Sequence, residues 1–214
     1  LEMAADTSAV LSGVNATSAE NITVTGDQAT AFTVTLANAT GSSDVVTLDL
    51  KSGTSTSNVD ITGLSVVGVE TLNVKGSTGT ADTDSDLTFA SSGADKLTAV
   101  NFSGTADMTI DGDNTSKAIT FTSTATGAVT ATGAFVKGST LTTGSGKDEV
   151  TLSTNTGSTY NTGTGDDTIT AAFGKLVATG SDDHTVDGGA GTDTLTISDT
   201  GATTLIDNHF TNVT

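Results

Sequence analysis

The chain has 214 residues, of which 25 are acidic and 7 basic, so its formal net charge is −18 at pH 7. This charge repels nucleic acids and anionic membrane surfaces, and it attracts divalent cations. There are no cysteines, which excludes disulfides and thiolate metal sites. No segment approaches the run of about eighteen apolar residues that a membrane helix needs, and no secretory signal peptide is recognisable at the N-terminus.

Short strand-like runs recur along the chain roughly every ten residues, separated by clusters of glycine, serine or asparagine. In chain order the predicted strands are Val45–Leu50, Glu70–Val74, Lys96–Phe102, Ala118–Phe121, Glu149–Leu152, Asp167–Thr170 and Asp193–Ile197. No segment has a sustained helical period, and Asp207–Phe210 is the one candidate for a helical turn. The spacing of the runs alone is compatible with a β-sandwich or a solenoid.

Three copies of a glycine-rich nonapeptide favour the solenoid. They are Thr143–Thr151, Thr162–Thr170 and Gly188–Thr196, and the last one matches the complete pattern G-G-x-G-x-D-x-U-x, in which U is a large apolar residue. This pattern is known as a calcium-binding unit of parallel β-helices. Its glycines allow positive φ angles and expose carbonyl oxygens, its aspartate supplies the hard anionic oxygen that Ca²⁺ prefers, and its apolar residue begins a strand.

The distances between the motif aspartates predict the size of one turn of the solenoid. A shorter element, Asp-x-(Val/Leu/Ile)-Thr, begins at Asp44, Asp95, Asp148, Asp167 and Asp193, but only the last three follow a G-x-G. The 19 residues from Asp148 to Asp167 fit a turn with two strands. The 26 residues from Asp167 to Asp193 predict an insertion, which we place within residues 171–183.

The candidate calcium ligands are the three motif aspartates together with the residues of their glycine-rich turns. The full predicted set is Thr143, Gly144, Ser145, Gly146, Asp148, Thr162, Gly163, Thr164, Gly165, Asp166, Asp167, Gly188, Gly189, Gly191 and Asp193. Asp182, Asp183 and Asp187 are further candidates. The alternative interpretation is a set of β-hairpins whose turns need glycine at positive φ.

No group of residues suggests catalysis. His184 and His209 are isolated in the sequence, so neither a zinc site nor a Ser-His-Asp set is predicted. The adjacent acids Asp166 and Asp167 are part of the calcium motif, which accounts for them without acid–base chemistry. The sequence therefore predicts a protein that is not an enzyme.

The nonapeptides, the segment Val-Glu-Thr-Leu-Asn-Val at 69–74, the bias toward threonine, glycine and aspartate, and the absence of cysteine resemble bacterial RTX-repeat proteins secreted by type I systems. Within that group, the chain is most similar to calcium-dependent surface-layer proteins. The resemblance implies export by a type I system through an uncleaved C-terminal signal, folding triggered by Ca²⁺ outside the cell, and assembly into a lattice on the bacterial surface. It also implies contact with cell-surface polysaccharide or lipopolysaccharide through segments outside this sequence.

The expected fold is all-β: an elongated parallel β-solenoid, or RTX β-roll, with little helix. We expect residues 1–139 to form a solenoid-like or sandwich-like region with degenerate repeats. Residues 140–214 should form a calcium-binding β-roll that is truncated at its C-terminus, because 207–214 resembles the opening of the segment 61–74.

The function predicted from these features is that of a structural, calcium-binding fragment of a self-assembling surface-layer protein, with no nucleic-acid partner and no membrane insertion. One alternative is the repeat region of a secreted adhesin or toxin. A third is an ice-binding solenoid, suggested by Thr-x-Thr pairs such as Thr120/Thr122 and Thr130/Thr132. The irregular spacing of these pairs along the chain places that alternative last.

Overall fold

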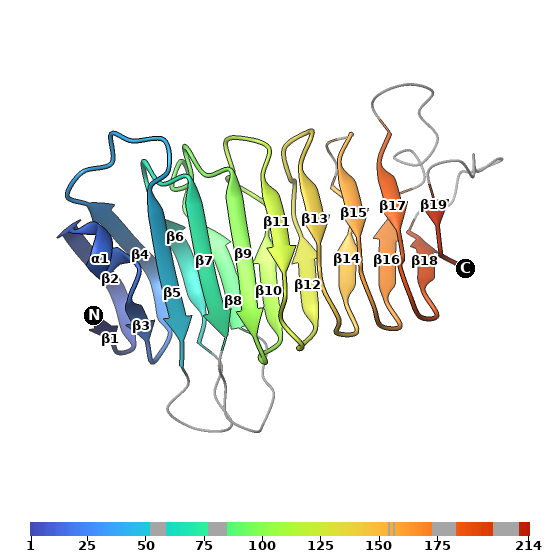
Figure 1. Cartoon of the computed structure of the whole chain (residues 1–214), viewed down its shortest axis with the longest axis horizontal. Coiled ribbons are helices and arrows are strands. Elements are labelled where there is room, and N and C mark those ends of the chain that lie inside the picture. Colours follow the sequence, from blue (N-terminus) through green and yellow to red (C-terminus); the bar gives the residue numbers. More distant parts are fainter. Residues whose placement is uncertain (52–58, 77–84, 154, 156, 173–182, 199–209) are drawn as a thin grey trace.

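The computed structural model describes residues 1–51, 59–76, 85–153, 155, 157–172, 183–198 and 210–214. The chain winds into an elongated solenoid, with the N-terminus at one end and the C-terminus at the other (Figure 1). Two stacked sheets form its walls, and all strand pairs within the described residues are parallel. The predicted fold class, an all-β parallel β-solenoid with little helix, is confirmed.

The strands alternate between the two sheets along the chain. The ten-stranded sheet contains β1 (Glu2–Met3), β3 (Ile22–Val24), β5 (Val45–Leu50), β7 (Thr71–Gly76), β9 (Ala99–Gly104), β11 (Thr120–Ser123), β13 (Thr140–Thr142), β15 (Thr159–Asn161), β17 (Thr185–Asp187) and β19 (Phe210–Thr211). The nine-stranded sheet contains β2 (Asp6–Val14), β4 (Gln28–Leu36), β6 (Ile61–Ser65), β8 (Ser85–Phe89), β10 (Met108–Asp111), β12 (Val129–Thr132), β14 (Glu149–Thr151), β16 (Thr168–Ala171) and β18 (Thr194–Ile197).

The core lies between the sheets and is built from aligned inward-pointing side chains. Alternation of apolar and polar residues in each strand sends one set of side chains inward. In the ten-stranded sheet, the parallel register aligns Val46, Leu72, Val100, Phe121, Leu141, Tyr160, Val186 and Phe210 in one file. The rings of Phe102 and Phe121 meet edge to face with centroids 4.8 Å apart. Each coil therefore buries its apolar residues against the coils before and after it.

All seven predicted strands occur, with shifts of a few residues at their ends. The strands from β1 to β12 pair in parallel with those of the neighbouring coils, so the described part of residues 1–139 is solenoid and not sandwich. The sheets continue across residue 139, since β11 pairs with β13 and β12 with β14. Most of the remaining strands were not predicted because they have only two to five residues. The exceptions are β2 and β4, with nine residues each, in which serine, threonine and alanine weaken the hydrophobic signal.

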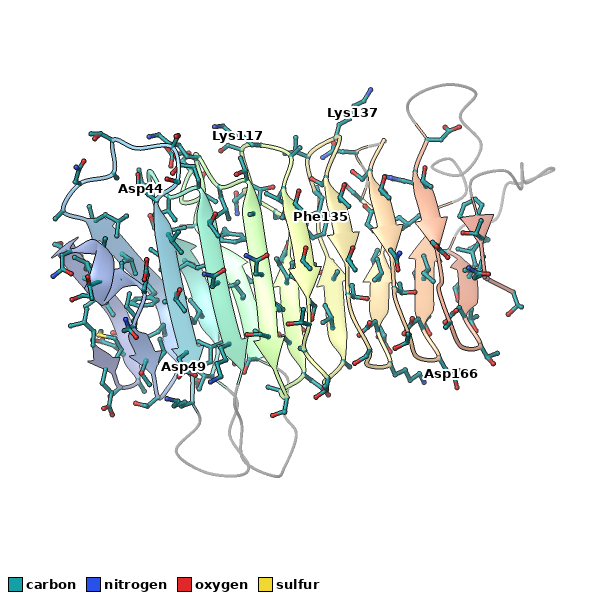
Figure 2. All side chains as sticks on the ribbon, in the orientation of Figure 1. Asp44, Asp49, Lys117, Phe135, Lys137 and Asp166 are labelled. Atoms are coloured by element: carbon teal, nitrogen blue, oxygen red, sulfur yellow. The ribbon has the colours of Figure 1, made fainter. Side chains whose placement is uncertain are left out.

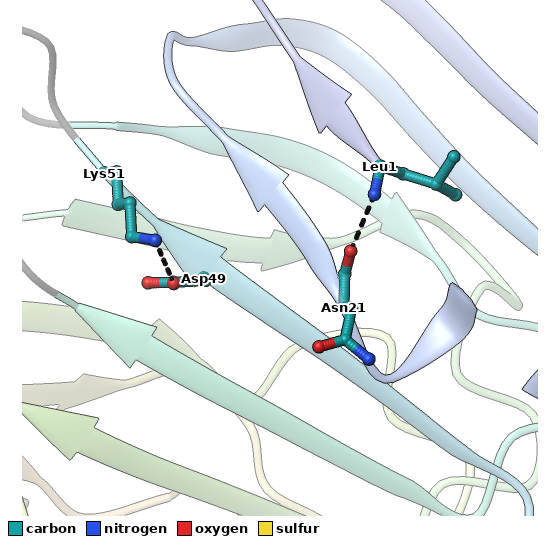
Figure 3. Close-up of polar contacts among 4 residues, drawn as sticks. All are labelled: Leu1, Asn21, Asp49 and Lys51. Atoms are coloured by element: carbon teal, nitrogen blue, oxygen red, sulfur yellow. Dashed lines mark hydrogen bonds and ion pairs between the residues drawn. The ribbon is translucent and has the colours of Figure 1, made fainter. Parts of the chain in front are cut away.

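The first coils hold the one helix of the described residues, α1 (Ala16–Ala19), which Asn15 caps by accepting from the Ser18 N–H at 2.9 Å. The N-terminal amino group of Leu1 donates to the Asn21 carbonyl oxygen, also at 2.9 Å (Figure 3). No helix within the described ranges is long and apolar enough to cross a membrane.

Two edges of the solenoid join the sheets. At the edge that we call the motif edge, the chain passes from the ten-stranded to the nine-stranded sheet, and its connections include 105–107, 124–128, 143–148, 162–167 and 188–193. This edge lies at the bottom of Figures 1 and 2, where Asp166 is labelled. At the opposite edge the chain returns to the ten-stranded sheet. Lys117 and Lys137 extend from that edge (Figure 2).

The longer spacing from Asp167 to Asp193 is also one coil, because β16 pairs with β18 and β15 with β17. The extra residues lie between β16 and β17, as predicted, but 173–182 are outside the described residues. The predicted helical turn at 207–210 also falls outside them, except for Phe210 in β19. β19 lies in the ten-stranded sheet and β6 in the other, so the sequence similarity between 207–214 and the segment from Ile61 does not place them in equivalent strands.

Candidate calcium sites at the motif edge

All three nonapeptides place their glycine-rich turns on the motif edge, stacked one above another in successive coils. Gly163, Gly165, Gly189 and Gly191 have φ angles of +85°, +142°, +81° and +147°, in the region where L-residues are strained. A Cβ on any of them would lie within about 2 Å of a carbonyl oxygen in the preceding coil, for example 2.0 Å from Gly146 O at Gly165. The glycines thus allow backbone carbonyls of adjacent coils to approach closely.

The three motif aspartates form one ladder along the inner side of this edge. Sheet register aligns Asp148 with Asp167 and Asp167 with Asp193. Their side chains are buried, with exposures of 0%, 1% and 2%. The Oδ1 atom of each accepts a hydrogen bond from the preceding coil: Asp193 from the Asp167 N–H at 2.9 Å, Asp167 from the Asp148 N–H at 2.8 Å, and Asp148 from the Val129 N–H at 2.7 Å. The structure therefore brings the three motif aspartates together at one edge.

The Oδ2 atoms of the three aspartates differ in whether they accept a hydrogen bond. The Oδ2 atom of Asp148 accepts from the Thr143 hydroxyl at 2.6 Å. The Oδ2 atoms of Asp167 and Asp193 are buried and have no hydrogen-bond partner among the residues that the structure describes. The Thr162 hydroxyl lies near Asp167, but it has one proton and donates it to Gly188 O at 2.9 Å. Two buried anionic oxygens without a donor are costly, and a cation bound at each of them, together with the neighbouring carbonyls, would remove that cost.

The residues present therefore fit a calcium ion. Asp167 and Asp193 would contribute carboxylate oxygens, and the glycine turns would contribute carbonyl oxygens, which together are the hard ligands that Ca²⁺ takes. Across the described ranges, no three His, Cys, Asp or Glu side chains lie close enough together to hold a metal ion on their own. Backbone oxygens are thus an essential part of the proposed ligand set.

Upstream coils use aspartates differently at the same edge. Asp27 Oδ1 accepts from the Asp60 N–H and Asp60 Oδ1 from the Asp86 N–H, each at 3.1 Å, so the exposed Asp27 and the half-buried Asp60 bridge to a neighbouring coil. The exposed Asp166 does the same toward the Thr192 N–H at 2.8 Å. On the inner side, the position of the motif aspartates is occupied by apolar residues upstream, Met108 and Val129. The inner position changes from apolar to acidic at Asp148.

Other predicted ligands do not belong to the buried ladder of aspartates. Ser145 and Thr164 are exposed at the tips of their turns. Asp187 Oδ1 accepts from the Gly189 N–H at 3.0 Å and from Asn212 Nδ2 at 2.8 Å, and the Asn212 bond in particular lowers the pKa of Asp187. Asp183 is buried just before β17, at the opposite edge from the motif turns. Asp182 is outside the described residues.

His184 is also at the opposite edge and is buried. Its Nδ1 accepts from the Ser158 N–H at 3.2 Å, and its Nε2 lies 3.1 Å from Ser153 O. The ring contacts Tyr160 edge to face at 5.3 Å between centroids. Because both ring nitrogens contact the backbone, a packing role accounts for this histidine. His209 lies outside the described residues.

Burial raises the pKa of Asp148 to about 6, despite the hydrogen bonds from Thr143 and Val129, and it also raises the pKa of Asp167. A carboxyl whose pKa is higher in the folded than in the unfolded state destabilises the fold when ionised, so the stability of the calcium-free protein should rise as the pH falls from 7 through 6 toward 4. Asp148→Asn should reduce this rise, measured by urea unfolding in metal-free buffer. Asp166→Asn, at an exposed position, is the control. Equal pH dependence of Asp148→Asn and the unsubstituted chain would contradict the expectation.

The fold and the geometry of the motif edge define this chain as a parallel β-solenoid with a ladder of buried aspartates at one edge. Comparison with known proteins identifies no relative, since the chain matches no model of a known protein family, no curated protein and no solved structure.

Proposed function

We propose that this chain is a calcium-binding structural region of a secreted bacterial surface protein, and that it is not an enzyme. The observation that carries the proposal is the pair of buried carboxylate oxygens, Asp167 Oδ2 and Asp193 Oδ2, for which the described part of the chain offers no donor. They lie in consecutive coils, next to turns whose glycines bring carbonyl oxygens close. A divalent cation satisfies both features at once.

Calcium suits this edge better than magnesium. The oxygens would come from flexible glycine turns and from carboxylates in different coils, and Ca²⁺ accepts six to eight such ligands in variable geometry. Mg²⁺ requires a tight octahedron and gives up its water reluctantly. Residues 140–214 carry ten acidic and two basic residues, so cation binding also relieves local repulsion between charges.

The surface-layer assignment rests on the resemblance of the nonapeptides to secreted repeat proteins and on the shape of the fold. A solenoid whose coils are bound to each other by parallel strands is a stiff rod-like unit, suited to a structural role. Folding that depends on Ca²⁺ fits a location outside the cell, on the bacterial surface. Contact with surface polysaccharide or lipopolysaccharide would involve segments outside this sequence. The repeat region of an adhesin or toxin is the alternative that shares the same calcium chemistry.

Replacing Asp167 should weaken calcium binding more than replacing Asp95. Asp167 has a buried oxygen without a donor in a motif turn, whereas Asp95 lies before β9 and accepts from the Gly68 N–H at 2.8 Å. Asp167→Ala removes a charged ligand from a site with several ligands, and we expect a loss of tenfold or more in affinity by titration calorimetry. Asp95→Ala should leave the affinity unchanged. Equal affinities in the two variants would refute the assignment of the site.

Calcium should also promote self-association beyond its effect on folding. A net charge of −18 opposes contact between copies, and calcium bridges carboxylates while monovalent salt only screens them. Sedimentation at several protein concentrations, with CaCl₂ or with NaCl at matched ionic strength, should show larger species only with calcium. A monomer under all conditions would favour the adhesin or toxin alternative over the surface layer.

The ice-binding alternative gains one observation. Although the Thr-x-Thr pairs are irregular along the chain, the sheet register places Thr120 and Thr122 beside Thr140 and Thr142. This run of aligned pairs ends after the two strands, since Ala99 and Asn101 lie beside Thr120 and Thr122 on one side and Asn161 lies beside Thr142 on the other. We therefore keep this function last, and thermal hysteresis measured on the folded protein would be its distinguishing property.

A further inference from the structure

The three motif aspartates have the same position in the fold. They differ in their contacts with the residue that directly follows the preceding strand of the ten-stranded sheet. Register aligns Thr142, Asn161 and Asp187, so the following residues, Thr143, Thr162 and Gly188, occupy equivalent positions. Each of these residues lies next to the motif aspartate of its own coil. The chain thus contains three versions of one site, in which the neighbouring residue donates to the motif aspartate, donates to a different oxygen, or has no hydroxyl.

In the first coil the neighbour closes the site. Thr143 is 1% exposed, and its hydroxyl donates to Asp148 Oδ2 at 2.6 Å. Asp148 Oδ1 accepts from the Val129 N–H. Both carboxylate oxygens of Asp148 therefore have donors from within the protein, and the ladder of buried charges ends here against the apolar position of Val129 and Met108.

In the third coil the equivalent residue has no hydroxyl to donate. A Cβ built on Gly188 would lie 2.2 Å from Asn212 O and 2.9 Å from Asp193 Oδ2, so glycine is the residue that fits there. Asp193 Oδ2 is thus left without a donor among the described residues. In the second coil, Thr162 gives its proton to Gly188 O, so Asp167 Oδ2 also remains without a donor.

We propose that the Thr143 hydroxyl takes the place of an ion at Asp148, so that calcium binds at Asp167 and Asp193 but not at Asp148. Thr143 thereby sets the N-terminal boundary of the row of ions. The coil that contains Asp148 forms without calcium and provides the surface on which the calcium-dependent coils stack. This inference rests on the proposed calcium function. It restricts calcium to two of the three motif aspartates, Asp167 and Asp193.

The experiment is calcium titration calorimetry on the full 214-residue chain after removal of metal, with CaCl₂ as the titrant and circular dichroism as a check on folding. Asp148→Asn should bind as many ions per chain as the unsubstituted protein, whereas Asp193→Asn should bind one fewer. Thr143→Gly, which copies the arrangement at Gly188, should bind one more. Thr143→Ser keeps the hydroxyl and should bind the unsubstituted number.

The possible results distinguish the role of Thr143 from calcium binding by the chain as a whole. If Asp148→Asn loses an ion, or if Thr143→Gly binds the same number as the unsubstituted chain, the role of Thr143 is overturned while calcium binding stands. If the unsubstituted chain binds no calcium, the proposed function is overturned and this inference with it. Asp148→Asn keeps the test valid should Thr143→Gly fail to fold, because the Thr143 hydroxyl can then donate to Thr162 O, 3.3 Å away.

Discussion

Removal of calcium is expected to lower the melting temperature of the protein by several degrees and to loosen its C-terminal coils first. Ligand binding to the folded state adds RT ln(1 + [L]/Kd), which is about 2.7 kcal/mol per site at a hundredfold excess over Kd. For a chain of this size, that corresponds to about 5–10 °C in melting temperature. The effect should be largest where Asp167 and Asp193 would otherwise remain buried without donors.

Calorimetry with CaCl₂ or EDTA measures the shift in melting temperature, and hydrogen exchange locates it. We expect amides of β15 to β18 to lose protection in EDTA while those of β5 to β9 keep it. MgCl₂ at the same concentration as CaCl₂ is the control and should stabilise less. An unchanged melting temperature in EDTA would show that these turns do not bind calcium.

Gly163→Ala should destabilise the fold by roughly 2–5 kcal/mol, with or without calcium. Gly163 has a φ of +85°, which costs about 1–2 kcal/mol for an L-residue. In addition, the new Cβ would lie 2.1 Å from Gly144 O, and that carbonyl cannot move freely because it accepts from the Thr164 N–H at 2.9 Å. Overpacking of this kind adds about 1–3 kcal/mol.

Gly138→Ala is the matched control, because Gly138 also has a positive φ but no atom close to the position of the new Cβ. Its φ is +87°, and its Cβ would have only an ordinary contact, at 3.7 Å from the Ala118 Cβ. We expect a loss of only about 1–2 kcal/mol there, from the backbone term alone. Urea unfolding of both variants measures the difference. Equal losses would mean that the close approach of adjacent coils at Gly163 is not a constraint on the fold.

The sequence was sufficient to predict the class of fold because the nonapeptides combine glycine, aspartate and an apolar residue at spacings that favour stacked turns over β-hairpins. The Asp148–Asp167 spacing gave the length of a coil, and the longer Asp167–Asp193 spacing located the extra residues between β16 and β17. Runs such as Val45–Leu50 were recognisable as strands because large β-branched residues and leucine alternate with polar ones.

The upstream half of the solenoid was harder to predict, since its coils vary in length and its turns lack the motif. Strands such as Val129–Thr132 contain alanine and threonine, whose alternation is weak as a hydrophobic signal. Their pairing becomes visible only when the coils are stacked, which aligns residues that lie about twenty positions apart in the sequence.

At the candidate site, the residue types and the ladder of aspartates could be predicted, but the inequality among the three aspartates could not. Whether a carboxylate oxygen has a donor depends on where the hydroxyls of Thr143 and Thr162 point, and the two residues are identical in the sequence. The one available signal was the change from Thr to Gly at position 188 in the otherwise similar turns.

The change of the inner edge position from Met108 and Val129 to aspartate has a consequence for how the rod melts. Each strand pairs only with the strands of the coils beside it, so stability is a sum of local and nearest-neighbour terms. Loss of ions would therefore weaken the coils that contain Asp167 and Asp193. The interfaces between the upstream coils would remain intact. In high calcium the rod should unfold in a single cooperative step, and in low calcium in two. The external calcium concentration would then determine how much of its length is rigid.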